Sequence, residues 1–247
     1  MDVPADARPL DGVPGVLARL ARRFASVSVV SGRSAAFLWG HLGDVAADAT
    51  SPVRLVGLHG MEAATPEGAV VLDPSAAAWL PTVHEVAERL GSGAPDGVRV
   101  ETTGPSITVH FRGAPAARAW VTARTAEESA SGLVAHPGRM SVELRPALGI
   151  DKGDVVRRTA QGCRAAAFFG DDLGDVPAFA ELARLAAADG MWTVGVAVID
   201  EETAPEVAAS ADLSVSGPSG ALAVLTWLAD SADGADSADG GAPAGAG

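Results

Sequence analysis

The sequence contains one cysteine and few basic residues. Because Cys163 stands alone, an intramolecular disulfide is impossible, which suits a reducing compartment. The formal net charge of -13 and the lack of any basic run argue against binding to a nucleic-acid backbone. No stretch is long and apolar enough to span a bilayer, and the first residues do not resemble a signal peptide. We therefore predict a cytoplasmic protein with neither nucleic-acid nor membrane partners, and the sequence gives no indication of its oligomeric state.

The length and the apolar content of the chain predict a folded α/β protein. Its 247 residues, 48% of them hydrophobic, leave room for a large core and an inserted smaller domain. Short β-branched runs such as Val27 to Val30 alternate with amphipathic helical stretches such as Val13 to Phe24. The same alternation resumes at Asp151 and continues to Ala229. It predicts a parallel sheet with helices on both faces.

A different pattern separates the two parts of this alternation. Between residues 75 and 146, a helix followed by two strand segments occurs twice, which is typical of a small antiparallel sheet covered by two helices. We therefore predict a core formed by residues 1–74 and 147–230 and an inserted domain formed by residues 75–146. Residues 231–247 contain only Ala, Asp, Gly, Ser and Pro, so we expect a disordered tail.

Two polar positions lie where a core strand ends or a core helix begins. Ser31 follows the strand predicted over Val27 to Val30, with Gly32 beside it. A hydroxyl and free backbone N–H groups at such a place can hold phosphate oxygens. Lys152 begins a predicted helix, where its ammonium group can neutralise phosphate charge. The two positions together predict a phosphate site.

Three carboxylates form a third candidate group. Asp171, Asp172 and Asp175 follow the apolar run that ends at Gly170, and carboxylate oxygens are suitable ligands for Mg²⁺. Each group alone has an ordinary structural explanation, since serines and aspartates often cap helices and a lone lysine is usually solvated. The combination, with every group at the matching end of its element, favours a site for phosphate and Mg²⁺.

The same residues resemble the motifs of a known enzyme superfamily. Val29 to Arg33, Asp151 to Gly153 and Gly170 to Asp175 are similar to the second, third and fourth motifs of haloacid-dehalogenase-like phosphatases. Further segments resemble, more narrowly, the trehalose-6-phosphate phosphatase family: ARPL at 7–10, GLHGME at 57–62, HFR at 110–112 and VELRP at 142–146. The resemblance covers about residues 7–228, and these outer motifs are more specific than Ser-Gly-Arg.

This resemblance implies a parallel Rossmann-like core sheet with an inserted α/β cap, and a Mg²⁺-dependent hydrolysis of a sugar phosphate in trehalose biosynthesis. Ser31 and Lys152 would hold the transferring phosphoryl group. Asp171 would bind Mg²⁺, Asp172 would lie near it, and Asp175 would support either the metal or Lys152.

The resemblance also implies substrate-binding residues on the core and on the cap. They are Arg33, His59, Glu62, Glu143 and Arg145, and His110 is a further, weaker candidate. The cap would close over the sugar and select the substrate. One departure lies in the cap, where the family commonly has a lysine after the acidic residue of the first cap strand, and this sequence has Thr102 and Thr103 after Glu101.

A larger departure concerns the first motif of the family, Asp-Xaa-Asp-Gly-Thr, which is not in this sequence. In the family its first aspartate is the nucleophile that forms an aspartyl-phosphate, and its second is the general acid and base. Asp2, Asp6 and Asp11 follow no apolar strand, so none of them matches the motif. We therefore expect a chain with a phosphate clamp but without the nucleophile, inactive or weakly active as written.

The missing motif also has a consequence for the fold. In the family it ends the central strand, which lies between the strand ending at Ser31 and the strand ending at Gly170. We expect this central first strand to be missing, which leaves two unpaired strand edges. A GTG valine codon taken as a start codon at Met1 would explain the absence.

Two alternatives remain open at this stage. The chain could be a non-catalytic, regulatory protein that binds a phosphosugar without turnover. It could also be a phosphatase for another small-molecule sugar phosphate such as sucrose phosphate, because the cap rather than the core determines the substrate.

Overall fold

The protein is described here from a computed structural model, which covers residues 8–138 and 140–231. The first part of the core contains α1 (Val13–Ala21), β1 (Val27–Val30), α2 (Ala35–Ala46), β2 (Val53–Gly57), the 3₁₀ turn η2 (Leu58–Gly60), β3 (Glu62–Ala64) and β4 (Val70–Leu72). The second part contains α6 (Lys152–Thr159), β9 (Ala165–Gly170), α7 (Val176–Asp189), β10 (Trp192–Ile199), α8 (Pro205–Ser210), β11 (Leu213–Ser216) and α9 (Gly217–Asp230). The predicted disordered tail lies, apart from Ser231, outside the described residues, as do Asp2 and Asp6.

The described core strands form two separate sheets. One has the order β1-β2-β3-β4, in which β1 and β2 are parallel and β3 and β4 are antiparallel to their neighbours. The other has the order β11-β10-β9 and is entirely parallel. Within residues 8–138 and 140–231, β1 and β9 are therefore edge strands. The α/β fold is as the sequence predicts, but only the second core sheet is wholly parallel, because β3 and β4 make the first one mixed.

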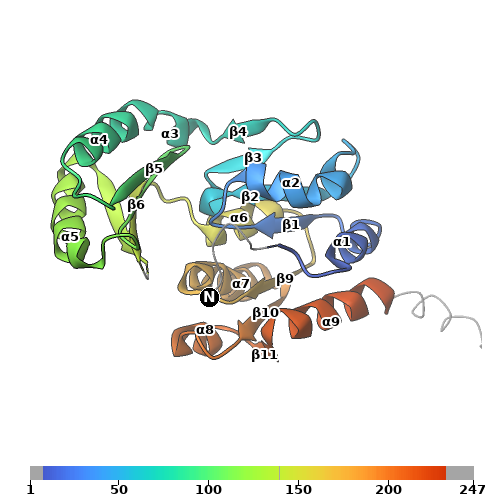
Figure 1. The fold of residues 1–247 in the computed structure, drawn as a ribbon. Helices are drawn as coiled ribbons and strands as arrows, with labels where there is room; N and C mark the ends of the chain where they lie inside the picture. Colours follow the sequence, from blue (N-terminus) through green and yellow to red (C-terminus); the bar gives the residue numbers. More distant parts are fainter. Residues whose placement is uncertain (1–7, 139, 232–247) are drawn as a thin grey trace, which may run out of the picture.

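Helices pack on the two core sheets through apolar clusters. Leu17 of α1 and Leu38 and Leu42 of α2 pack on Val53 and Leu55 of β2. Helix α7 packs on β9 and β10, and helix α6 lies beside α7. Helix α9 contacts both β10 and α1, and therefore joins the second part of the core to the first (Figure 1).

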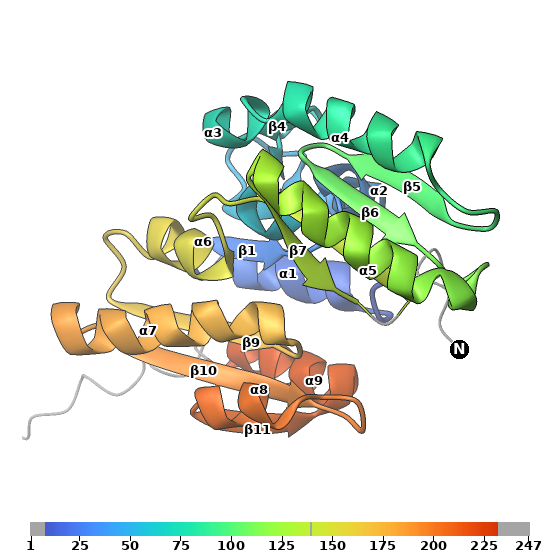
Figure 2. The same ribbon diagram turned by 90° about the vertical axis from the view of Figure 1, so that its left-hand side faces the viewer.

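The remaining elements form a layer of their own on one side of the core. They are α3 (Pro74–Ala77), α4 (Leu80–Ser92), β5 (Arg99–Thr103), β6 (Ser106–His110), α5 (Arg118–Glu127), β7 (Leu133–Pro137) and β8 (Ser141–Pro146). The strands form an antiparallel sheet with the order β5-β6-β8-β7, and α4 and α5 cover one face of it (Figure 2). We call this layer the cap.

Alternation along the cap strands explains why only one face is covered. The residues that face α4 and α5 include Ile107, Val109, Val142 and Leu144, each at most 6% exposed. Their sequence neighbours are polar and lie on the opposite face, because side chains alternate along a strand. The cap thus presents a polar sheet face that its own helices do not cover.

Two expectations about the fold need correction. The first helix expected in the inserted domain is two helices, α3 and α4, because Pro81 has no N–H to continue the preceding turn and lies instead in the first turn of α4. Helices lie on both faces of the second sheet, α7 and α8 on one face and α9 on the other, but α9 covers its face only in part. Trp192 is 82% exposed and Leu213 is 59% exposed, because α9 leaves this end of β10 and β11 open.

No helix among the described residues is long and apolar enough to cross a membrane.

Candidate active site

The turn after β1 is held by backbone hydrogen bonds to the neighbouring β2 end. The Ser31 N–H donates to the Val56 carbonyl (3.0 Å), and the Ser31 hydroxyl accepts from the Arg33 N–H (3.1 Å). The residue that caps α2 is Ser34, whose hydroxyl accepts from the Phe37 N–H. Ser31 is therefore not the helix cap, and its hydroxyl lies in the turn at the carboxyl end of β1.

Lys152, the only lysine in the sequence, is buried at the start of α6. Its Nζ lies 2.5 Å from Asp175 Oδ1 and 3.7 Å from Asp172 Oδ1. Asp175 is itself only 2% exposed. Separating the two partners would leave an uncompensated buried charge. The ion pair therefore holds the start of α6 against the loop that follows β9. Asp151 caps α6 by accepting from the Asp154 N–H.

The carboxylates after β9 form a compact loop around Asp175. The second oxygen of Asp175 accepts from the N–H groups of Asp171 (2.9 Å) and Asp172 (3.1 Å), so that both of its oxygens have protein partners. Gly170 packs directly against this side chain, since a Cβ at Gly170 would lie 2.5 Å from Asp175 Cγ. Asp175 thus holds Lys152 and the loop, which is the second of the two roles expected for it.

Asp171 and Asp172 remain accessible to solvent at the carboxyl end of β9. The pKa of Asp171 is raised. The larger cause is the partial burial of its carboxyl group, and the smaller one is the negative charge of Asp172 and Asp175. Within residues 8–138 and 140–231, no group of three or more His, Cys, Asp or Glu side chains is arranged to hold a metal ion. The accessible carboxylates after β9 are thus those of Asp171 and Asp172.

His59 lies in a strained turn between these groups. Leu58 (φ 48°) and His59 (φ 59°) are the only non-glycine residues with positive φ in the described part of the chain. This backbone region costs roughly 1 kcal/mol or more per residue. Burial first, and then the charges of Arg145 and Lys152, lower the pKa of His59 to about 4. The imidazole is therefore neutral near pH 7.

Two other expected site residues have mainly structural contacts. Glu62 is 6% exposed, and its Oε1 accepts from the Ala35 N–H at the start of α2 (2.5 Å). Burial raises the pKa of Glu62. The Arg33 guanidinium lies 4.5 Å from the centre of the Phe37 ring. These contacts place both side chains around the first turn of α2.

The cap contributes a polar row that faces the core. Thr108, Glu143 and His136 stand opposite one another on β6, β8 and β7. The Nε atom of Arg145 lies 3.7 Å from Glu143 Oε2. The positive charge of Arg145 also contributes to the lowered pKa of His59 in the core. Burial raises the pKa of Glu143, an effect that Arg145 partly offsets.

Contact between cap and core occurs next to this row. The β5–β6 turn at Gly104 lies against Leu58 and Glu62, because a Cβ at Gly104 would be 3.1 Å from Leu58 Cδ1 and 3.5 Å from Glu62 Oε2. His110 lies elsewhere on the cap sheet and pairs with Glu101 (3.2 Å).

Sequence reasoning missed His136. Burial and then the Arg145 charge lower its pKa, which places it in the same cluster as Arg145 and His59. The only sequence signal is its position in one of the strand segments expected in the inserted domain. The register that sets it opposite Glu143 is a tertiary feature.

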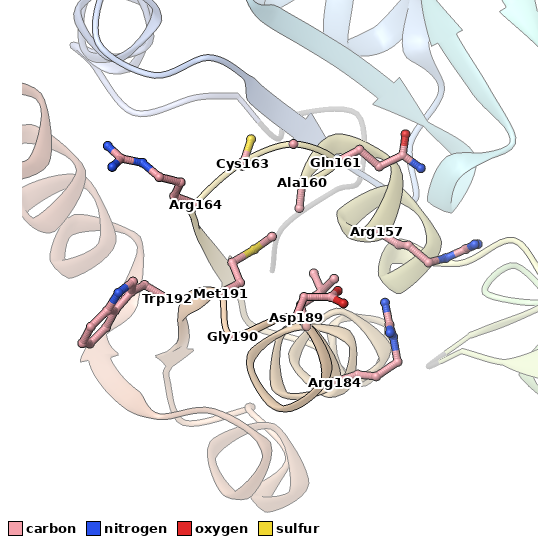
Figure 3. A pocket seen from close by; sticks show the side chains of 12 residues that line it. Arg157, Ala160, Gln161, Cys163, Arg164, Arg184, Asp189, Gly190, Met191 and Trp192 are labelled. Carbon is pink, nitrogen blue, oxygen red and sulfur yellow. The ribbon is translucent and has the colours of Figure 1, made fainter.

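A hollow of about 650 Å³ lies away from this site. Figure 3 shows it at the amino ends of β9 and β10, beside Cys163, Arg164 and Trp192. Two of the arginines that line it already have acidic partners, since Arg157 pairs with Asp154 and Arg184 with Glu181. The polar groups that could act on a phosphate are at the opposite ends of the strands.

The buried ion pair yields a testable prediction. Asp175→Asn leaves the Lys152 charge buried without its partner, so we expect a loss of about 3–5 kcal/mol in the free energy of unfolding. Asp172→Asn is the matched control, because its side chain is 59% exposed and 3.7 Å from Lys152, and should cost less than about 1 kcal/mol. Urea denaturation measures both. Equal losses for the two variants would contradict the assignment of Asp175 as the partner of Lys152.

Solved structures confirm the fold. A trehalose-6-phosphate phosphatase related protein superposes with a TM-score of 0.69 at 20% identity, over 93% of this chain and 91% of that chain. The C-terminal domain of the Candida albicans trehalose-6-phosphate phosphatase gives a TM-score of 0.67 at 20% identity, over 93% and 87%. Structural neighbours also include a haloacid dehalogenase-like hydrolase from Bacteroides thetaiotaomicron, with a TM-score of 0.58 at 13% identity over 87% of this chain and 91% of that chain.

Sequence comparison identifies the family. A trehalose-phosphate phosphatase of Mycolicibacterium paratuberculosis is 33% identical over 195 residues, which are 72% of this chain and 47% of the relative. One from Mycobacterium tuberculosis is 32% identical over 185 residues, 67% of this chain and 44% of the relative. The chain thus spans about half the length of the curated relatives it matches. Because the trehalose-phosphatase family pattern matches residues 1–219, this chain belongs to the trehalose-phosphatase family.

Proposed function

We propose that the chain is the phosphatase unit of a Mg²⁺-dependent enzyme that hydrolyses trehalose 6-phosphate to trehalose and phosphate, in trehalose biosynthesis. The observation that carries this proposal is the buried Lys152–Asp175 pair, which lies beside the accessible carboxylates of Asp171 and Asp172. The curated relatives that are trehalose-phosphate phosphatases support the choice of substrate.

On the core side, Ser31 and Lys152 hold the phosphoryl group. The Ser31 hydroxyl offers a hydrogen bond, and the Lys152 ammonium group neutralises negative charge where little water competes. The amino end of α6 adds its dipole to this attraction. Asp171 and Asp172 hold Mg²⁺, and their mutual repulsion, which helps to raise the pKa of Asp171, is relieved by a cation. When bound, Mg²⁺ stabilises charge on the phosphoryl oxygens.

On the cap side, the polar row binds the sugar. Glu143 and Arg145 supply acceptors and donors for hydroxyl groups, and Thr108 and His136 lie beside Glu143 in the same sheet face. His59 and Glu62 lie on the core side of this site, and Arg33 lies beside α2. A half-buried, hydrogen-bonding site of this kind discriminates between sugars, because a substrate that lacks a matching hydroxyl leaves polar groups unpaired.

We also propose that the nucleophile belongs to a strand that pairs between β1 and β9. Two observations support this. The sequence contains no Asp-Xaa-Asp-Gly-Thr motif, and both β1 and β9 are edge strands in the described part of the chain. A parallel strand in that position would end next to Ser31 and Gly170. Without this strand, the chain keeps the phosphate-binding residues Ser31 and Lys152 but is inactive or weakly active.

One alternative keeps the fold and the ligand but removes the reaction. A regulatory protein that binds a phosphosugar without turnover is favoured by the absence of the nucleophile motif. Another sugar phosphate, such as sucrose phosphate, remains the alternative substrate.

Binding and turnover of sugar phosphates separate these possibilities. We expect the chain, in the presence of Mg²⁺, to bind trehalose 6-phosphate at least about tenfold more tightly than sucrose 6-phosphate or glucose 6-phosphate, a difference of about 1.4 kcal/mol. Calorimetry measures binding, and phosphate release measures turnover. Release above the level of an Asp171→Ala control excludes the non-catalytic alternative. Failure to bind any of the three would contradict the proposed function.

The coding DNA tests the proposed strand. Read in frame upstream of Met1, it should encode Asp-Xaa-Asp-Gly-Thr after an apolar stretch, before any stop codon is reached. A stop codon that comes first would contradict the proposal of a misplaced start.

A further inference from the structure

We infer that His59 is a positioning residue: its neutral ring lies as a spacer between the Ser31–Gly32 turn and the loop from Gly170 to Asp175, and sets the distance between the phosphate-holding and metal-holding groups. This inference rests on the proposed function and goes beyond it, because it gives His59 a role that needs no contact with the sugar.

The backbone of the His59 turn is bound to the Ser31 turn. The His59 N–H donates to the Ser31 carbonyl (2.9 Å), and the Leu58 N–H donates to the Arg33 carbonyl (3.0 Å). These two hydrogen bonds occur in the turn where Leu58 and His59 have positive φ angles, a strained arrangement that persists only where the surroundings enforce it. The strain therefore has a specific result, which is to bring the imidazole over the phosphate turn.

The imidazole itself lies between two glycines from different loops. A Cβ at Gly32 would be 2.7 Å from His59 Nε2 and 2.8 Å from Cε1, closer than any real contact of this kind. On the other side, a Cβ at Gly174 would be 3.8 Å from the same Cε1 atom. The ring thus lies against both the Ser31–Gly32 turn and the carboxylate loop. Only the Ser31–Gly32 turn needs a glycine to accept it, because the distance at Gly174 is an ordinary van der Waals contact.

The third contact of the turn is with the helix that carries Lys152. A Cβ at Gly60 would be 2.9 Å from Val155 Cγ2 of α6, and Arg158 of α6 reaches the Gly60 carbonyl (3.5 Å). The same arginine lies 3.5 Å from Asp73, where the chain leaves the core for the cap. The His59 turn therefore touches all three groups that form the proposed site: the Ser31 turn, the Lys152 helix and the carboxylate loop.

The position of His59 is disfavoured for a further positive charge. The Lys152 charge and the Arg145 charge both act on His59, so a second cation between them would be repelled and would compete for the carboxylates. A ring that fills space, carries no charge and is fixed by its backbone can hold the two loops apart without disturbing the Lys152–Asp175 pair.

The test compares four variants of the full chain by their affinity for inorganic phosphate with Mg²⁺ and by their thermal unfolding midpoints. In His59→Asn the new asparagine can adopt the positive φ angle, but its shorter side chain does not reach Gly174. Gly32→Ala displaces the ring by its new methyl group. The double variant combines the two changes. Gly40→Ala is the control glycine, because nothing lies within 4 Å of its added methyl group.

We expect His59→Asn and Gly32→Ala each to weaken phosphate binding roughly tenfold, since small misplacements of a binding group have large effects. The unfolding midpoint of His59→Asn should stay close to that of the unchanged chain. The double variant should bind no more weakly than His59→Asn alone, because without the ring the methyl group meets no obstacle, and Gly40→Ala should bind normally.

Three results would overturn the inference. The first is unchanged phosphate affinity in His59→Asn, and the second is losses in the two single variants that multiply in the double variant. A His59→Asn variant that loses affinity only in step with its unfolding midpoint would likewise show a merely structural residue. If the unchanged chain binds no phosphate, both the proposed function and the positioning role fail. If the unchanged chain binds phosphate and His59→Asn binds it equally well, only the positioning role fails.

Discussion

The site depends on one buried ion pair, Lys152 with Asp175. Lys152 begins α6 and Asp175 precedes α7, so the pair joins two helices at the carboxyl end of the second sheet. The remaining oxygen of Asp175 fixes the backbone of the carboxylate loop, which leaves Asp171 and Asp172 facing solvent. A charge removed from water needs a partner, and here the same partner also shapes the loop. The arrangement of cation and carboxylates at this site follows from that constraint.

Much of the fold could be predicted from the sequence, because hydrophobic periodicity and glycine or proline positions determine the elements. The strand at Val27 to Val30 and the alternating helices and strands from Lys152 onward have the expected order. The split of the helix near Pro81 is a local effect of proline, and the sequence contains that signal. The exposed end of β10 around Trp192 carries no local signal, because it depends on where α9 packs.

The site could be predicted only in part. Motifs indicate which residues follow the strand ends, and the structure brings Lys152 and the three aspartates together as those motifs suggest. Sequence reasoning left open whether Asp175 supports the metal or Lys152, because that depends on a contact between residues 23 positions apart. The roles of Glu62 at the start of α2 and of His136 beside Glu143 depend on tertiary packing and strand register, which no motif encodes.

Because Lys152 is the only lysine, the chain labelled with ¹³C-lysine gives one set of lysine NMR signals, and these report directly on the proposed phosphate site. The account predicts that inorganic phosphate with Mg²⁺ shifts the Lys152 side-chain signals in a saturable way, since its ammonium group neutralises the bound anion. Signals that do not move at phosphate concentrations which saturate binding measured by calorimetry would contradict the assignment of Lys152, and with it the central claim.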